Sequence, residues 1–238
     1  MKFKAYTDKG NIRERNEDNY LIKLDPYPII VVADGMGGHK AGKVASNIAV
    51  ESIKGFKFTF NNNNMLYDIK NAVKDANNKI IKKGSENPVQ QGMGTTISLA
   101  VVIDNQLYIG HVGDSRIYLY RNQQLQRITT DDSLVNELVK KGKISSEEAF
   151  DHPQKHILTQ ALGLEKDIKV ETNNILLKEN DILLFCTDGL TDMIREQEIA
   201  NIIDSNTSDI EVLARKLGDK ALENGGNDNI TLITGIIN

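Results

Sequence analysis

Four aspartates border apolar runs of the sequence. They are Asp34 after 29–33, Asp188 after 183–187, Asp114 after 108–113 and Asp228 before 230–233. If the runs are buried strands, these carboxylates stand at strand ends. Carboxylates that converge on one place repel one another and are costly to hold near a core unless a cation neutralises them. We interpret the set as a candidate metal site.

A single Asp-Gly pair, such as Asp34-Gly35, is also a common turn. The repetition favours a site, and Glu17-Asp18 adds a further acidic pair in another polar segment. The sequence has no Cys-x-x-Cys or His-x-x-x-His pair, and its 4 histidines are scattered. Oxygen ligands alone predict Mg²⁺ or Mn²⁺ rather than zinc or copper. Several carboxylates around one point can hold two such ions about 3.5–4 Å apart, as in sites that hydrolyse phosphoryl groups.

Arg13 lies just before this acidic pair and could grip phosphate oxygens while the neighbouring acids hold metal. A competing phosphate site is the segment 37–44, GGHKAGKV, which nearly matches the P-loop pattern and would imply a nucleotide hydrolase. Val44 stands where that loop needs a hydroxyl for Mg²⁺. A P-loop NTPase is therefore disfavoured but stays an alternative.

The bulk composition is that of an ordinary globular protein. The 238 residues carry a formal net charge of -4 and are 39% hydrophobic, enough for a sizeable core. The acidic balance argues against nucleic acid or an anionic membrane as a partner. The sequence holds no apolar run near the roughly 20 residues of a membrane span. The single cysteine, Cys186, predicts a buried thiol and no intrachain disulfide, and we expect a cytoplasmic monomer.

Hydrophobic periodicity predicts the elements that must position these side chains. It predicts helices over 41–54, 65–83, 133–163 and 208–224, and strands over 95–103, 106–113, 116–121, 168–177, 181–187 and 230–237. Ser145 with Glu148, and Ser208 with Glu211, have capping-box spacing. Short connections between strands favour antiparallel hairpins, so the pattern indicates an α+β layered sandwich rather than a doubly wound sheet.

These segments together resemble the metal-dependent protein phosphatase family (protein phosphatase type 2C) in its short bacterial form. The matching motifs occur in the family's order, and they are 13–18 RERNED, 32–39 VADGMGGH, 94–96 GTT, 112–116 VGDSR, 186–190 CTDGL and 227–231 NDNIT. The resemblance spans the chain. It implies one phosphatase domain over 1–238, folded as a four-layer αββα sandwich of two stacked, mainly antiparallel sheets flanked by helices.

The resemblance also implies roles for individual positions. Asp34 would bridge two metals, with Asp188 and Asp228 completing one of them. The Gly35 carbonyl would bind the other, with Asp18 nearby, directly or through water. Asp114 with Asp188 would hold a third, weaker metal. Arg13 would bind phosphate, and about 130–163 would form a mobile flap beside the site.

Three positions depart from the family pattern. Met36 stands where many members carry a histidine after Asp-Gly, so the general acid is not identified, and we keep His39 as a candidate. Asp132 replaces the usual histidine of an Asp-His-Ser motif at the flap, and His156 replaces a frequent asparagine. We expect both flap changes to bear on substrate contact and flap docking rather than on metal binding.

The predicted activity is hydrolysis of phosphoserine and phosphothreonine in proteins, with a metal-activated water attacking phosphorus in line with the departing oxygen. The expected partners are phosphoproteins, above all a Ser/Thr protein kinase and its targets. A catalytically silent phosphoprotein-binding protein of the same fold is the other alternative. The presence of every expected carboxylate argues against it.

Overall fold

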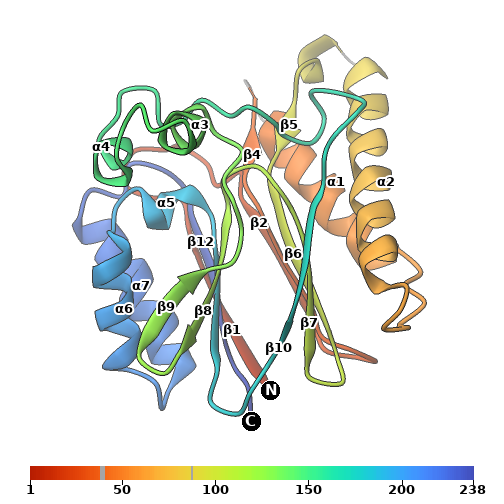
Figure 1. Ribbon diagram of the computed structural model, residues 1–238. Helices are drawn as coiled ribbons and strands as arrows, with labels where there is room; N and C mark the ends of the chain where they lie inside the picture. The colour runs from red at the N-terminus through yellow and green to blue at the C-terminus, as the bar shows by residue number, and fades with distance from the viewer. Residues whose placement is uncertain (38–40, 87) are drawn as a thin grey trace.

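Two antiparallel five-stranded sheets lie face to face in the structure, a computed structural model that describes residues 1–37, 41–86 and 88–238 (Figure 1). The first sheet has the order β1-β12-β11-β8-β9, with bounds Lys2–Asp8, Ile230–Ile236, Ile182–Cys186, Arg116–Arg121 and Gln124–Arg127. The second has the order β10-β7-β6-β3-β2, with bounds Glu171–Leu176, Gln106–Val112, Ile97–Ile103, Ile29–Ala33 and Asn19–Lys23. A small pair, β4 (Gly35–Met36) with β5 (Gly94–Thr95), continues from the second sheet.

The central strands are apolar on both faces because each lies between a sheet and a helical layer. In β3, Ile30 and Val32 pack against the other sheet, whereas Ile29 and Val31 pack against helices. The strand β11 shows the same alternation, with Phe185 between the sheets. Side chains of a strand point alternately to its two faces, so an unbroken apolar run predicts this double burial.

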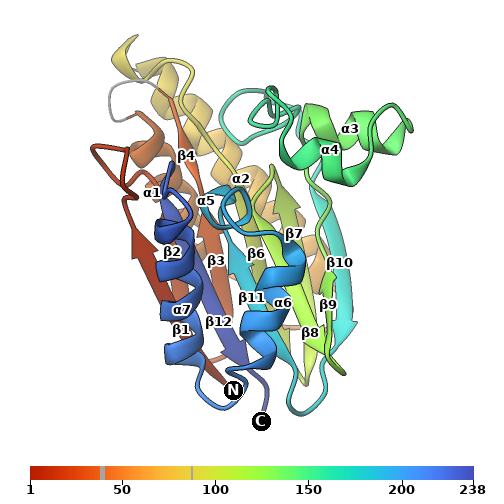
Figure 2. The ribbon, with the colours of Figure 1, turned by 90° about the vertical axis from the view of Figure 1, so that its left-hand side faces the viewer.

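Helices cover the outer face of each sheet (Figures 1 and 2). The helices α1 (Ala41–Gly55) and α2 (Met65–Glu86) pack on the second sheet; α6 (Glu196–Asp204) and α7 (Ile210–Glu223) pack on the first. The predicted α+β fold of four αββα layers is confirmed. The chain also contains the short helices η1 (Pro88–Gln90) and α5 (Asp188–Thr191).

Two details of the predicted elements are wrong. The helical pattern over 133–163 forms only α3 (Leu134–Lys140) and α4 (Ser146–Phe150), since the rest of the segment makes turns and bridges. The predicted capping box at Ser145 and Glu148 does form. The predicted Ser208–Glu211 box does not. Asp209 caps α7 instead, because its carboxylate accepts hydrogen bonds from the backbone N–H groups of Glu211 and Val212.

The short helices α3 and α4 lie at the same end of the sandwich as β4, and both termini lie at the opposite end (Figures 1 and 2). The end that carries β4 is where β3 and β11 finish, so it receives Asp34 and Asp188. Within the described ranges, no helix combines the length and apolar character that crossing a membrane requires.

Candidate metal centre

A pocket of about 690 Å³ opens at this end of the sandwich. Its lining includes most of the residues that the sequence singled out, namely Arg13, Asp34, Gly35, Asp114, Asp188 and Asp228. Asp18 is buried beneath it, 2% exposed, and close enough to Asp34, Asp188 and Asp228 to interact with their charges. Side chains from distant parts of the chain therefore converge on one place.

The backbone of Asp34 is held from three directions where β3 ends. Its N–H donates to the hydroxyl of Thr96 at 2.9 Å, and its carbonyl accepts from the hydroxyl of Thr95 at 2.7 Å and the N–H of Thr96 at 2.9 Å. The motif 94–96 thus fixes the position of Asp34. The Asp34 carboxylate is left free of these contacts and faces the pocket.

Asp18 is joined to the strand that precedes Asp188. The Thr187 hydroxyl donates to Asp18 Oδ2 at 2.8 Å, while the N–H of Asp18 donates to the side chain of Asn16 at 3.0 Å. The Thr187 hydroxyl also accepts from the N–H of Thr231 at 3.0 Å. These bonds connect the two sheets beneath the carboxylates.

Arg13 reaches the site from a loop that is fastened to the start of β12. The side chain of Asn229 accepts from Glu17 N–H at 2.8 Å and donates to the carbonyls of Lys9 and Arg15. Arg13 Nη2 donates to Asp228 Oδ2 at 2.7 Å. The guanidinium is about half exposed, with 56% of the side chain accessible, so its remaining donors face the open pocket.

Gly35 is packed so closely that no side chain fits. A Cβ there would collide with the carbonyl of Gly42, and one at Gly42 would lie 2.6 Å from the carboxylate of Glu17. The backbone at Gly35 can therefore approach the start of α1 directly. Close backbone approach is what glycine allows and other residues do not.

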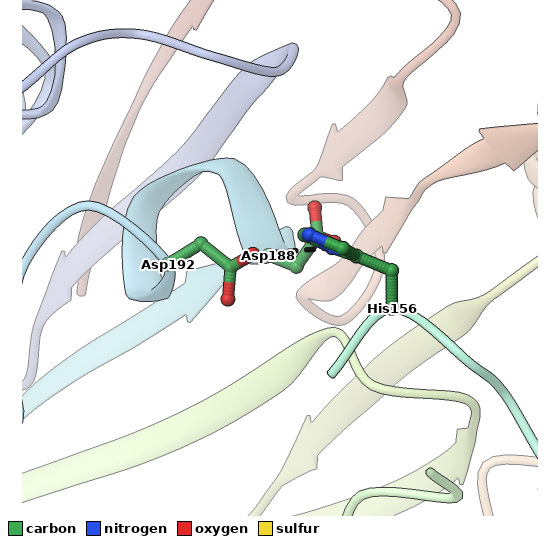
Figure 3. Close-up of side chains that lie close together, drawn as sticks. All are labelled: His156, Asp188 and Asp192. Atoms are coloured by element: carbon green, nitrogen blue, oxygen red, sulfur yellow. Dashed lines mark ion pairs between the residues drawn. The ribbon is translucent and has the colours of Figure 1, made fainter. Parts of the chain in front are cut away.

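The flap contributes His156 and Leu158 to the pocket lining. His156 is exposed, and its Nδ1 lies 3.3 Å from Asp192 Oδ2 and 3.9 Å from Asp188 Oδ2 (Figure 3). The ligand atoms of His156, Asp188 and Asp192 lie within 4.8 Å of one another. Proximity of Asp188, and then of Asp192, raises the pKa of His156 above its usual value.

Burial and mutual repulsion dominate the electrostatics of the site. Burial, opposed by hydrogen bonds from hydroxyls, raises the pKa of Asp18 to about 7. Burial first, and then the charges of Asp18, Asp188 and Asp114, raise the pKa of Asp34 well above its usual range. Burial and the charge of Asp188 do the same to the pKa of Asp114. Burial also disfavours ionised Asp188, but the adjacent His156 and Asp34 outweigh it and lower the pKa of Asp188.

The residues present fit hard divalent cations. Among the described residues, the buried atoms Asp18 Oδ1 and Asp188 Oδ1 have no hydrogen-bond partner. A buried carboxylate oxygen without a donor is costly, and clustered carboxylates compound the cost. Cations that take several oxygen ligands, such as Mg²⁺ or Mn²⁺, satisfy such atoms and neutralise the cluster.

Not every candidate from the sequence can be placed. His39 lies outside the described residues. The acid Asp192 was missed, although it stands four residues after Asp188 and hence one helical turn away, a spacing that the sequence displays. The sequence linked His156 to substrate contact and flap docking, but its position beside Asp188 and Asp192 was not predicted, because it depends on how the flap folds back.

Comparisons with known proteins now decide the family. A sequence model of the family described as Protein phosphatase 2C matches residues 12–223. The chain belongs to this family. A serine/threonine phosphatase of Listeria welshimeri is 40% identical over 233 residues, covering 95% of this chain and 92% of the relative.

Two solved structures place the phosphatase among bacterial enzymes of this fold. The serine/threonine phosphatase Stp1 of Staphylococcus aureus has a TM-score of 0.94 at 35% identity, covering 100% of this chain and 95% of that one. The catalytic domain of PstP, a serine/threonine protein phosphatase solved in complex with 2 manganese ions, has a TM-score of 0.89 at 30% identity, covering 100% and 98%.

The predicted family, fold and enzyme class are confirmed. The protein is a metal-dependent serine/threonine protein phosphatase of the type 2C family, and phosphoproteins are its class of substrate. The P-loop NTPase alternative is excluded by the family match, and the catalytically silent alternative gives way to the enzyme. The resemblance of 37–44 to a nucleotide-binding loop is a coincidence of spacing.

Proposed function

We propose that this phosphatase hydrolyses phosphoserine and phosphothreonine with two divalent cations, Mn²⁺ or Mg²⁺, held by Asp34, Asp188, Asp228 and the Gly35 carbonyl. Asp18 supports them directly or through water, and Asp114 with Asp188 holds a third, weaker ion. The observation that carries the proposal is the convergence of buried carboxylates from both sheets, with oxygens that the described residues leave unpaired.

The cations, when bound, supply positive charge to the phosphoryl group and acidify a water for attack on phosphorus. The protein's own residues bind the phosphate and hold the carboxylates in position. Arg13 binds phosphate oxygens with donors that Asp228 leaves unused, and its loop is held in place by Asn229. The hydroxyls of Thr95 and Thr96 keep Asp34 at the centre of the site, so little reorganisation is needed during reaction.

We further propose that residues 1–238 act as one phosphatase domain, with residues 130–163 as a flap beside the site. His156 of this segment lines the same pocket as Arg13 and lies beside Asp188 and Asp192, which supports a role of the flap at the site. A Ser/Thr protein kinase and its targets as the physiological substrates, a monomeric state and a cytoplasmic location stay predictions from the sequence. His39 stays a candidate proton donor to the departing oxygen.

Activity measurements test the proposed metal site. We expect the purified protein to hydrolyse p-nitrophenyl phosphate and a phosphothreonine peptide with added Mn²⁺, and to lose both activities in EDTA. Asp34→Ala and Asp188→Ala should each lower kcat by about a hundredfold or more, as loss of a principal electrostatic group does. Asp75→Asn is the matched control, because Asp75 pairs with Lys79 on the surface of α2. Full activity after chelation would overturn the proposal.

A further inference from the structure

Asp132, one of the two flap positions that depart from the family pattern, forms a reciprocal pair of hydrogen bonds with Gly113. The N–H of Asp132 donates to the Gly113 carbonyl at 2.7 Å, and the N–H of Gly113 donates to Asp132 Oδ2 at 3.0 Å. Gly113 immediately precedes Asp114. The flap is therefore fastened to the turn that carries a proposed metal ligand.

Both ends of the flap meet at the same residue. The N–H of Thr159 donates to the Asp132 carbonyl at 2.8 Å, and Gln160 Nε2 donates to Asp132 Oδ2 at 3.1 Å. Gln160 is itself fixed, because its amide exchanges hydrogen bonds with the backbone of Lys169 in both directions. A single oxygen, Asp132 Oδ2, thus joins the returning end of the flap to Gly113.

The turn at Gly113 has little freedom to absorb a displacement. Gly113 has a φ of 107°, in the region that favours glycine, and a Cβ there would lie 2.6 Å from Thr96 Cγ2. On the other side of Asp114, the Ser115 hydroxyl bonds to that of Thr96 at 2.6 Å, and the Ser115 carbonyl accepts from Ser98 at 2.8 Å. Thr96 also holds Asp34. A displacement of the flap at Asp132 must therefore also displace Asp114.

We propose that Asp132 is a positioning residue. It couples the flap, at the contacts that Asp132 makes with Thr159 and Gln160, to Asp114 through Gly113. The carboxylate oxygen acts as an acceptor shared by two elements, so the position of the flap and the position of Asp114 change together. The geometric coupling stands on the hydrogen bonds alone; its effect on catalysis rests on the proposed role of Asp114 in binding metal.

Two variants of similar size distinguish the role of the Asp132 carboxylate as a hydrogen-bond acceptor from its contribution to packing. Asp132→Asn keeps an oxygen where both hydrogen bonds converge, whereas Asp132→Leu has a similar size and no acceptor. Glu137→Ala is the control, since Glu137 pairs with Lys141 on the flap surface. The reporter is amide hydrogen exchange at Gly113 in metal-free protein, measured relative to the core amide of Leu99. If Asp132→Leu does not fold, Asp132→Ala replaces it.

We expect Asp132→Leu to accelerate exchange at Gly113 by about three- to tenfold, the factor that corresponds to one lost hydrogen bond. The Mn²⁺ concentration that gives half-maximal activity should also be higher in Asp132→Leu than in the wild type. Asp132→Asn and Glu137→Ala should have wild-type values in both measurements. Wild-type exchange in Asp132→Leu, or equal loss in Asp132→Asn, would overturn the coupling. Faster exchange at Gly113 in an enzyme that needs no metal would instead reject the proposed function and leave the coupling intact.

Discussion

Asp34 is the residue where stability and function conflict most directly. Burial and three neighbouring carboxylates raise its pKa well above the usual range, so the ionised form is disfavoured in the metal-free fold. We expect Asp34→Asn, which keeps the shape and removes the charge, to increase the free energy of unfolding in EDTA at about pH 7.5 by about 1–3 kcal/mol. The same variant should have lost its phosphatase activity. Urea unfolding and a phosphatase assay check the two halves.

The Asp75→Asn variant again provides the comparison for that measurement, since its carboxylate is surface-exposed and paired with Lys79. It should change neither quantity. If Asp34→Asn were less stable than the wild type in EDTA, burial and electrostatic repulsion would not destabilise the ionised Asp34 in the metal-free fold.

Asp18 gives the metal-free protein a predictable pH dependence. Its pKa is about 7 in the folded state against an ordinary value of 3.8, so between these values the folded state binds more protons than the unfolded state. Stability therefore falls as pH rises from about 4 to about 7, by up to about 4 kcal/mol. The urea midpoint in EDTA should be higher at about pH 5 than at about pH 7.5. Asp18→Asn should make the slope less steep, with Asp34 and Asp114 supplying the remainder, and an equally steep slope in that variant would assign the whole effect to those other groups.

At the scale of elements, the start of α7 has a different cap from the one that the sequence pattern predicts. Ser208 and Glu211 have the spacing of a capping box, yet Asp209 accepts the hydrogen bonds at the helix start. We expect Asp209→Ala to lower the free energy of unfolding by about 1 kcal/mol, the usual value of an N-cap. Ser208→Ala, one residue earlier and exposed, should change it little. Thermal or urea unfolding of the two variants decides between the caps. An equal decrease in the free energy of unfolding in both variants would support the predicted capping box instead.

Most of the strands that the sequence predicted have long apolar runs; the edge strand β10, predicted within 168–177, is a mixed segment with exposed residues. The run 29–33 and the run before Asp188 are buried on both faces, so their composition alone identifies them. The edge strands β1 and β2 were missed, because each has one exposed or half-buried face and mixes polar with apolar residues. The helix α6 was missed for a different reason. It starts without a side-chain cap at Arg195, so no start signal marks it.

For the candidate site too, local sequence patterns predict some residues, and tertiary contacts determine the others. The aspartates at the ends of β3 and β11 follow from strand patterns, and the structure brings them to one pocket. The partners that hold them, such as Thr96 for Asp34 and Thr187 for Asp18, depend on tertiary contacts between segments far apart in the sequence. No local pattern encodes such contacts. Their roles in metal binding stay predictions until the site is measured.

At the scale of the whole molecule, the acidic cluster stands across the junction between the two sheets. Asp34 follows β3 of one sheet, whereas Asp188 and Asp228 border β11 and β12 of the other. Asp114 lies on the connection between β7 and β8, which belong to different sheets. In the metal-free state, burial and mutual repulsion raise the pKa values of Asp18, Asp34 and Asp114, so an ionised cluster disfavours the contact between the sheets at this end. A bound cation reverses the sign of that interaction.

Metal binding should therefore stabilise the whole fold rather than one loop. Saturation to about 100 times the dissociation constant adds about 2.7 kcal/mol if the unfolded chain does not bind. For a chain of this length that corresponds to an increase in Tm of roughly 5–10 °C. Calorimetry with Mn²⁺ or Mg²⁺ against EDTA should show a single transition that moves upward as metal is added. The Asp34→Ala variant should show a much smaller shift, and Asp75→Asn the full one. A transition that splits on metal addition, with only one part moving, would mean that the cations bind one sheet and leave the other unaffected.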